Sequence, residues 1–333
     1  MRLPFRIVTI HFYIAIFLCL VLITCSYKDS VLSNKSPAEE ESLEVKWQRT
    51  AMLEEDITLI PAVHKYLSID NHKVYISLST SPVRLPKIMQ TLQTLDLKFV
   101  EAILLVLPTL YRNKSAYPDL SAVSAFNKLK ILQPDKEWPQ NWPEEDIGPV
   151  MKLLPAVEWV KQQTNDEESI VITIDDDIAY SKGMIGQLIK TAVLSDVVAG
   201  SRGINVKYWN IDPQRWPSTI ITKNCTLEDI SSCDVIEGFG AVAYKIKFID
   251  SQEILKFSSL SEECKTSDDL VISFSLAKAS IPRLMVANEY TTLLQLEYGF
   301  GADALHKEFG QHKNNQDMNA ERYSRCLKRL EGV

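Results

Sequence analysis

Three consecutive carboxylates, Asp175–Asp177, stand out as residues whose types and spacing could do chemistry. Like charges this close repel one another unless a cation shares them. Magnesium and manganese prefer oxygen ligands and can bridge a carboxylate to a phosphate. The tripeptide therefore indicates either a metal site for a phosphorylated ligand or an acidic turn that caps the following helix.

A second acidic pair, Asp268 and Asp269, follows Ser267, which we expect to be the N-cap of an amphipathic helix within the segment 265–279. Helix capping explains one acid at this place. Two in succession favour a catalytic carboxylate.

Two cations precede these acids in the sequence. Arg84 ends the loop 79–84, and because a cation opposes the dipole at a helix start, we interpret it as a contact for a phosphate or base. Lys152 is expected in the first turn of a helix over residues 148–163, where N–H groups favour an anion such as a diphosphate. The alternative for both is an ordinary surface side chain.

The elements that must position these residues follow a strand–helix–strand order. Helices are expected over residues 85–97 and 148–163, after Ser181 to about Leu194, and over residues 265–279 and 319–330. Buried strands are expected at residues 73–79, 100–107, 129–132, 170–174 and 197–200. This order builds a mainly parallel sheet flanked by helices, whose strand ends bind ligands. We predict one α/β catalytic domain over residues 72–333.

Residues 234–244 are expected to form a strand, a turn and a further strand, with Gly238 and Gly240 in the turn. Glycine permits close backbone approach to a ligand. A simple bulge or tight turn is the alternative.

Composition excludes one class of partner. The chain has 333 residues, is 46% hydrophobic and 24% charged, and carries a formal net charge of −7. No basic stripe is present, so we expect no nucleic-acid partner.

The N-terminal region predicts a location outside the cytosol. Arg2 and Arg6 form a short tail (residues 1–6) before an uncharged apolar run, Ile7–Cys25. At about 1.5 Å per residue this run can span a bilayer core, and the preceding charges favour a cytoplasmic N-terminus. Residues 26–71 are polar and acidic and are interpreted as a stem. A cleaved signal peptide and a lipoprotein site at Cys25 remain alternatives.

The remaining cysteines agree with an oxidising compartment. They form an even set, in which Cys225–Cys233 and Cys264–Cys326 are plausible bridges, although four cysteines allow three pairings. Without a C-x-x-C pair, a zinc site is not expected. Possible N-glycosylation sequons begin at Asn34, Asn113 and Asn224.

Together these segments resemble a glycosyltransferase of the GT-A fold, of the exostosin-like or a related kind, with a D-x-D motif. The resemblance covers about Lys73 to Ala279. Its pieces are Y-I-S-L-S-T-S-P-V-R-L, G-P-V-M-K-L-L-P, I-T-I-D-D-D-I-A-Y, I-E-G-F-G-A-V-A-Y and T-S-D-D-L-V-I-S. It implies a hexosyl- or N-acetylhexosaminyl-transferase anchored as a type II membrane protein in the Golgi or endoplasmic reticulum lumen. The substrates would be a nucleotide sugar, most simply a UDP-sugar, and a hydroxyl of a glycan, glycoprotein or glycolipid.

The resemblance also implies roles for residues. Asp177 would hold Mn²⁺ or Mg²⁺ on the donor diphosphate, and Asp175 would contact the ribose or base and share the metal, with Asp176 supporting either. Asp269, beside Asp268, would be the general base. The other implied contacts are Arg84 and Lys152 to the nucleotide or its phosphates, Glu237, Gly238 and Gly240 in the sugar and acceptor pocket, and His312, or else His306, on the metal.

An Asp base favours single displacement with inversion, although retention stays open.

Two other functions remain: a non-catalytic relative that binds a sugar or partner, and a sugar nucleotidyltransferase. The latter would carry a glycine-rich phosphate loop after the first strand, and S-T-S-P-V-R-L has no glycine.

Overall fold

A computed structural model describes residues 72–112, 114–204, 234–238, 240–286, 293–296 and 315–332. All of them lie in one compact unit, Tyr66–Val333. Several predicted features lie outside the described residues: the tail, anchor and stem, the Cys225–Cys233 bridge, the sequon asparagines, His306 and His312. Within the described part of the chain, no helix is long and apolar enough to cross a membrane.

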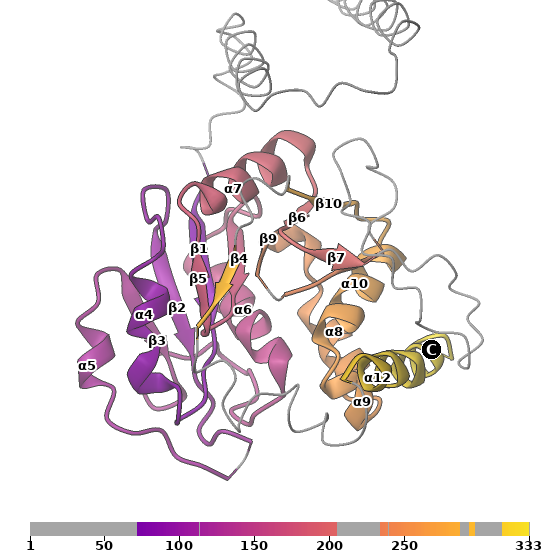
Figure 1. The fold of residues 1–333 in the computed structure, drawn as a ribbon, viewed down its shortest axis with the longest axis horizontal. Helices are drawn as coiled ribbons and strands as arrows, with labels where there is room; N and C mark the ends of the chain where they lie inside the picture. Colours follow the sequence, from indigo (N-terminus) through magenta and orange to yellow (C-terminus); the bar gives the residue numbers. More distant parts are fainter. Residues whose placement is uncertain are drawn as a thin grey trace, which may run out of the picture. The chain divides into compact units, whose positions relative to one another are not determined.

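A mixed sheet of seven strands forms the centre of the unit (Figure 1). Neighbouring strands are parallel, except that β9 runs antiparallel to both β4 and β6. The prediction of an α/β domain with a mainly parallel sheet is therefore confirmed. The strands, in sheet order, are β10 (Arg283–Met285), β6 (Val198–Gly200), β9 (Ala241–Lys245), β4 (Ile170–Ile174), β1 (Val74–Leu78), β2 (Ala102–Val106) and β3 (Leu129–Leu132).

Strand side chains alternate between the two faces of the sheet, and each face has its own apolar core. In β1, Val74, Ile76 and Leu78 pack into one core, and Tyr75 packs into the other. The first core is covered by α4 (Met89–Leu92), α5 (Ser121–Ser124) and α7 (Met184–Ser195). The second is covered by α6 (Leu154–Gln163), α8 (Ser251–Ser258), α10 (Asp268–Lys278) and α12 (Asn315–Leu330). Burial on both faces explains why the strands are near-continuous apolar runs.

One predicted helix is wrong in its extent. Residues 85–97 form a short 3₁₀ turn, η2 (Leu85–Lys87), and then α4, which ends at Leu92. The Thr94 hydroxyl donates to the Thr91 carbonyl at 2.7 Å. Such side-chain bonds compete with the helical ladder and favour an early end.

The segment 234–244 does contain two strands, but they do not pair with each other. β8 (Val235–Ile236) pairs with β7 (Gly203–Ile204), whereas β9 enters the large sheet between β4 and β6. The turn that holds Gly238 therefore connects two different sheets.

The order of the strands marks a candidate ligand edge. After β1 the chain builds β2 and β3 on one side and then returns to place β4 on the other. At such a switch point the loops after the two strands diverge and leave a crevice at their carboxyl ends. The loop with Arg84 follows β1, and the acidic tip Asp175–Asp177 follows β4. The tip leads into β5 (Ile178–Tyr180), which pairs with β11 (Leu293–Gln295).

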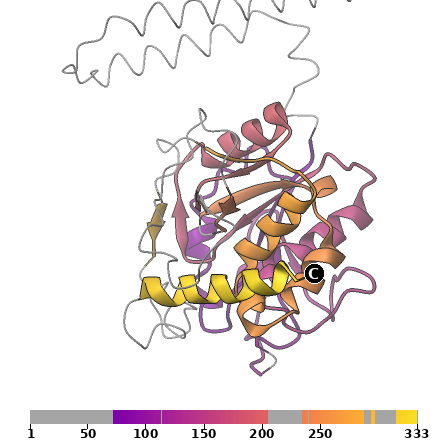
Figure 2. The ribbon, with the colours of Figure 1, turned by 90° about the vertical axis from the view of Figure 1, so that its right-hand side faces the viewer.

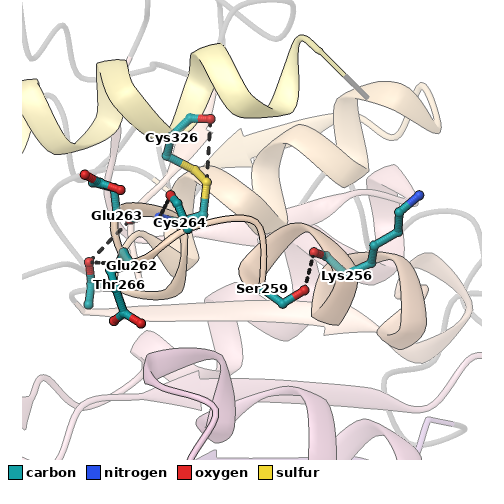
Figure 3. Close-up of a disulfide and its surroundings, with 8 residues drawn as sticks. Lys256, Ser259, Glu262, Glu263, Cys264, Thr266 and Cys326 are labelled. Carbon is teal, nitrogen blue, oxygen red and sulfur yellow. Dashed lines mark hydrogen bonds between the residues drawn. A yellow bond between two sulfur atoms is a disulfide. The ribbon is translucent and has the colours of Figure 1, made fainter.

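A disulfide links the last helix to the segment just before α10. A disulfide joins Cys326 in α12 to Cys264 in α9 (Glu262–Lys265), as Figure 3 shows, and Figure 2 shows α12 lying along this part of the unit. The expected Cys264–Cys326 pairing is confirmed.

Candidate functional site

The acidic tip is held by Arg84 from the neighbouring loop. One guanidinium nitrogen, Nη1, lies 2.9 Å from Oδ1 of Asp176 and 3.2 Å from Oδ2 of Asp177. Both aspartates are 6% exposed. A cation between two buried carboxylates offsets their mutual repulsion, so Arg84 stabilises the tip itself in this structure.

Hydroxyl groups that the sequence reasoning missed fix the backbone of the tip. Thr91 in α4 donates to the Asp176 carbonyl at 2.7 Å, and Thr80 donates to the Asp176 carboxylate. The Tyr180 hydroxyl accepts from the Asp175 amide at 2.8 Å. Threonines near an acidic loop are too common to have been singled out without knowing that α4 packs beside β5.

Lys152 approaches the tip from the opposite face of the sheet. It ends the 3₁₀ turn η3 (Pro149–Lys152) before α6, and its carbonyl accepts a hydrogen bond from the Ser77 hydroxyl of β1. Its Nζ lies 2.7 Å from Oδ1 of Asp175 and 3.8 Å from Oδ2 of Asp268. Lys152 thus joins the two acidic clusters that the sequence had suggested separately.

Asp268 and Asp269 open α10, as predicted, where the helix dipole favours negative charge. Oδ1 of Asp269 accepts the backbone N–H of Gly238 at 2.7 Å. Ser267 occupies the expected N-cap position, but its side chain makes no capping hydrogen bond.

The structure favours glycine at the two predicted positions for different reasons. A Cβ built on Gly238 would lie 2.8 Å from the Nζ of Lys152 and 2.9 Å from Oδ1 of Asp269. Gly240 has φ 123°, a conformation that favours glycine. At Gly238 the close approach is thus made by the chain's own charged side chains.

Burial dominates the electrostatics of the tip. It raises the pKa of Asp176 to about 6, with Asp177 and Asp175 adding, against the opposing effects of Arg84 and Thr80. Burial would lower the pKa of Lys152, but three nearby carboxylates (Asp175, Asp268 and Asp269) outweigh it and raise that pKa. The ammonium therefore stays charged.

The pKa values of the two carboxyls at the start of α10 are raised as well. Burial raises the pKa of Asp269 well above its ordinary value, with Asp268 and Glu237 adding, while Lys152 opposes. Burial also raises the pKa of Asp268 and of Glu237. Carboxyls with strongly perturbed pKa values that share a charge partner are candidates for acid–base chemistry.

Tyr323 of α12 is a further neighbour that sequence reasoning missed. Burial raises its pKa well above the ordinary value, and the charges of Asp269, Glu237 and Asp268 add to that effect. A tyrosine in a polar C-terminal helix gave no signal by itself, because only the packing of α12 against α10 brings it near these acids.

The fit of the site to a metal depends on the donor set. Among the described residues, no group of three or more histidines, cysteines or acids is arranged to hold an ion. Arg84 pairs with Asp176 and Asp177, Thr80 also binds Asp176, and Lys152 pairs with Asp175, so a metal would share the hard oxygen donors of Asp175 and Asp177 with these cations. Magnesium commonly binds one or two carboxylates and takes its other ligands from water and phosphates. The donors fit such an ion, and His312 lies outside the described residues.

The structure therefore brings most of the predicted site residues within its described part into two groups, whereas no contact joins Gly240 to them and His312 lies outside that part. Arg84 meets Asp176 and Asp177, and Lys152 with Gly238 meets the remaining acids. No family model matches this chain, and a search of curated proteins found no match.

Proposed function

We propose that this chain is a glycosyltransferase of the GT-A kind, which moves a sugar from a nucleotide-diphosphate sugar to a hydroxyl acceptor. One observation carries the proposal. The acids after β4 and the acids that open α10, far apart in sequence, meet through the Lys152 ammonium at the ligand edge of the sheet. A donor site and a base site side by side are what group transfer to a hydroxyl needs.

Asp269 is the proposed general base. A raised pKa makes a carboxylate a stronger base, which suits removal of a proton from an acceptor hydroxyl. The acceptor oxygen then bonds to the anomeric carbon while the bond to the diphosphate breaks. The proton goes to Asp269 and the electron pair leaves with the diphosphate, with inversion at the sugar carbon.

The β4 side is the proposed donor site. Asp175 would contact the ribose or base, Asp177 with Asp175 would hold Mn²⁺ or Mg²⁺, and Arg84 would turn to the nucleotide. When bound there, the metal would neutralise the charge that develops on the leaving diphosphate. The turn from Glu237 to Gly240 would line the sugar and acceptor pocket, and His312 is proposed as an additional metal contact.

We also propose that the catalytic unit lies on the non-cytosolic side of a membrane, in the lumen of the Golgi or endoplasmic reticulum. The apolar run Ile7–Cys25 supports an anchor. The Cys264–Cys326 disulfide supports an oxidising compartment, because such bonds persist mainly outside the cytosol.

The proposal is tested by screening nucleotide sugars for release of the nucleoside diphosphate in the presence of Mn²⁺ or Mg²⁺. Wild type should release it and lose the activity when the metal is chelated. Asp177→Ala should lower the rate at least about a hundredfold, because transition-state charge stabilisation is lost. Equal release by wild type and Asp177→Ala would overturn the assignment of Asp177.

Asp269→Asn in the same screen separates catalysis from binding. It should retain affinity for the nucleoside diphosphate and lose turnover, since the amide cannot accept the proton. Nucleotide binding without release by any variant would favour the non-catalytic alternative. Release of inorganic pyrophosphate would identify a nucleotidyltransferase.

A further inference from the structure

The Lys152 ammonium is paired with carboxylates of the protein itself. Its side chain is 12% exposed, and its Nζ lies between Asp175 of the tip and Asp268 of α10, at 2.7 and 3.8 Å. Its main chain is fixed as well, because the Ser77 hydroxyl of β1 binds the Lys152 carbonyl. Both ends of the residue are therefore held by the fold.

Gly238 provides the space for this arrangement. A side chain there would begin 2.8 Å from the Lys152 Nζ, a separation that real Cβ atoms essentially never show. Through its N–H, Gly238 also holds Asp269. One glycine thus admits the ammonium and positions the neighbouring carboxylate.

The backbone just before α10 contacts the backbone at the start of η3, the turn that carries Lys152. Gly148, with φ +83°, opens η3, and a Cβ on it would lie 2.8 Å from the Lys265 carbonyl oxygen. Lys265 ends α9 just before Asp268. The backbones that carry Lys152 and the α10 acids are therefore in direct contact, in addition to the ion pairs.

We propose that Lys152 is a positioning residue, which holds Asp175 and the Asp268–Asp269 pair in one array, and is not a ligand of the donor phosphates. This inference rests on the proposed function. Without the ammonium, Asp268 and Asp269 would face the Asp175 carboxylate as like charges and would move away from it, while the Tyr180 hydroxyl keeps the Asp175 main chain in place. The loss would appear in turnover, and donor affinity would be retained.

The test compares Lys152→Met and Gly238→Ala in the full chain. Lys152→Met removes the charge and keeps a side chain of similar length. Gly238→Ala keeps every charge but places a methyl group 2.8 Å from the Lys152 Nζ and 2.9 Å from Oδ1 of Asp269, so these side chains must shift. Gly186→Ala is the matched control, because a Cβ on Gly186 in α7 has no atom within 4 Å.

Both site variants should lower kcat about a hundredfold, the usual consequence of misplacing a reacting group by about 1 Å. The Kd of uridine diphosphate with Mn²⁺, measured by calorimetry, should change less than about twofold, because the inference assigns Lys152 no phosphate contact. Gly186→Ala should match wild type in both measurements. An unchanged kcat with weaker diphosphate binding in Lys152→Met, or wild-type kinetics in Gly238→Ala, would overturn the inference.

Amide hydrogen exchange provides a readout that does not depend on the enzyme activity. In Lys152→Met, and in Gly238→Ala if Lys152→Met does not fold, the first turn of α10 should exchange faster than in wild type and Gly186→Ala. If wild type releases no diphosphate but this difference is seen, the proposed function fails and the positioning role stands. Unchanged exchange at α10 would contradict the positioning role whatever the activity.

Discussion

Asp176 of the acidic tip is bound by neighbouring side chains at both its carboxylate and its carbonyl. Thr80 and Arg84 bind its carboxylate, and Thr91 binds its carbonyl. From the tripeptide alone the three aspartates could not be distinguished. Their contacts now separate them: Asp176 anchors the tip, while Asp175 and Asp177 lie on either side of it with different cations.

Asp176 should also reduce stability at neutral pH. Its pKa is about 6 in the folded protein against an ordinary 3.8, so between these values the folded state binds more protons than the unfolded state. The contribution of Asp176 to the free energy of unfolding therefore falls as pH rises from about 4 to about 6. Above about pH 6 the total loss is roughly 3 kcal/mol.

Asp176→Asn removes this ionisation with little change of shape. Urea unfolding should show the variant gaining up to about 3 kcal/mol over wild type at pH 8, and much less at pH 4.5. Asp119→Asn is the control: Asp119 is exposed and hydrogen bonds from Ser121 lower its pKa, so its effect should be flat over this range. A gain for Asp176→Asn that is equal at both pH values would contradict the assignment.

At the scale of elements, the start of α10 depends on α12. Cys264 lies in α9, shortly before the acids of α10, and is bonded to Cys326 of α12 (Figure 3). In the sequence of α12, Cys326 follows Tyr323 by about one turn. Residues one turn apart share a helix face, so the disulfide and Tyr323 face the same neighbours. The bond therefore holds Tyr323 close to the acids of the candidate site.

Replacing both cysteines by serine should destabilise the unit. The bond closes a loop with a sequence separation of 62 residues, and losing it should cost roughly 2–4 kcal/mol of unfolding free energy. Urea unfolding without reductant measures the loss. With reductant present, wild type and the double variant should unfold at the same urea concentration, and a persistent difference would mean that the substitutions disturb packing.

At the scale of the whole molecule, both cores lie within one unit. The buried side chains of the described residues run from Val74 to Leu330 and cover both faces of one sheet. α6 and α7 pack against this sheet, α8 packs against α6, and α10 packs against α8 and α12. The unit Tyr66–Val333 thus has the layered organisation expected of an independently folding domain.

A fragment that begins at Tyr66 should accordingly fold by itself. Its thermal midpoint, followed by circular dichroism under non-reducing conditions, should lie within about 3 °C of the midpoint of the full chain, since less than about 1 kcal/mol is expected to be lost. A broad, non-cooperative transition in the fragment would show that residues before Tyr66 contribute to the fold.

The sequence alone predicted the elements that depend on local pattern. Largely apolar runs identified β1, β2 and β4, because strands buried on both faces carry mostly apolar side chains. Helix periodicity found α6, α7 and α10 for a similar reason. The run that identified β3 includes Lys130, and β3 is a partly exposed strand at the edge of the sheet. Where local bonds compete with the pattern, as at Thr94 after α4, the predicted boundary was wrong.

The pairing of charges was beyond the sequence, because it depends on which strand ends become neighbours. Asp175–Asp177 received different roles only through the family resemblance, and Arg84 and Lys152 appeared as two separate cations. The insertion of β4 beside β1, and of β9 beside β4, brings Arg84 to one side of the tip and Lys152 with Gly238 to the other. Local sequence carries the chemistry of each residue, whereas long-range packing determines which charges lie within reach of one another.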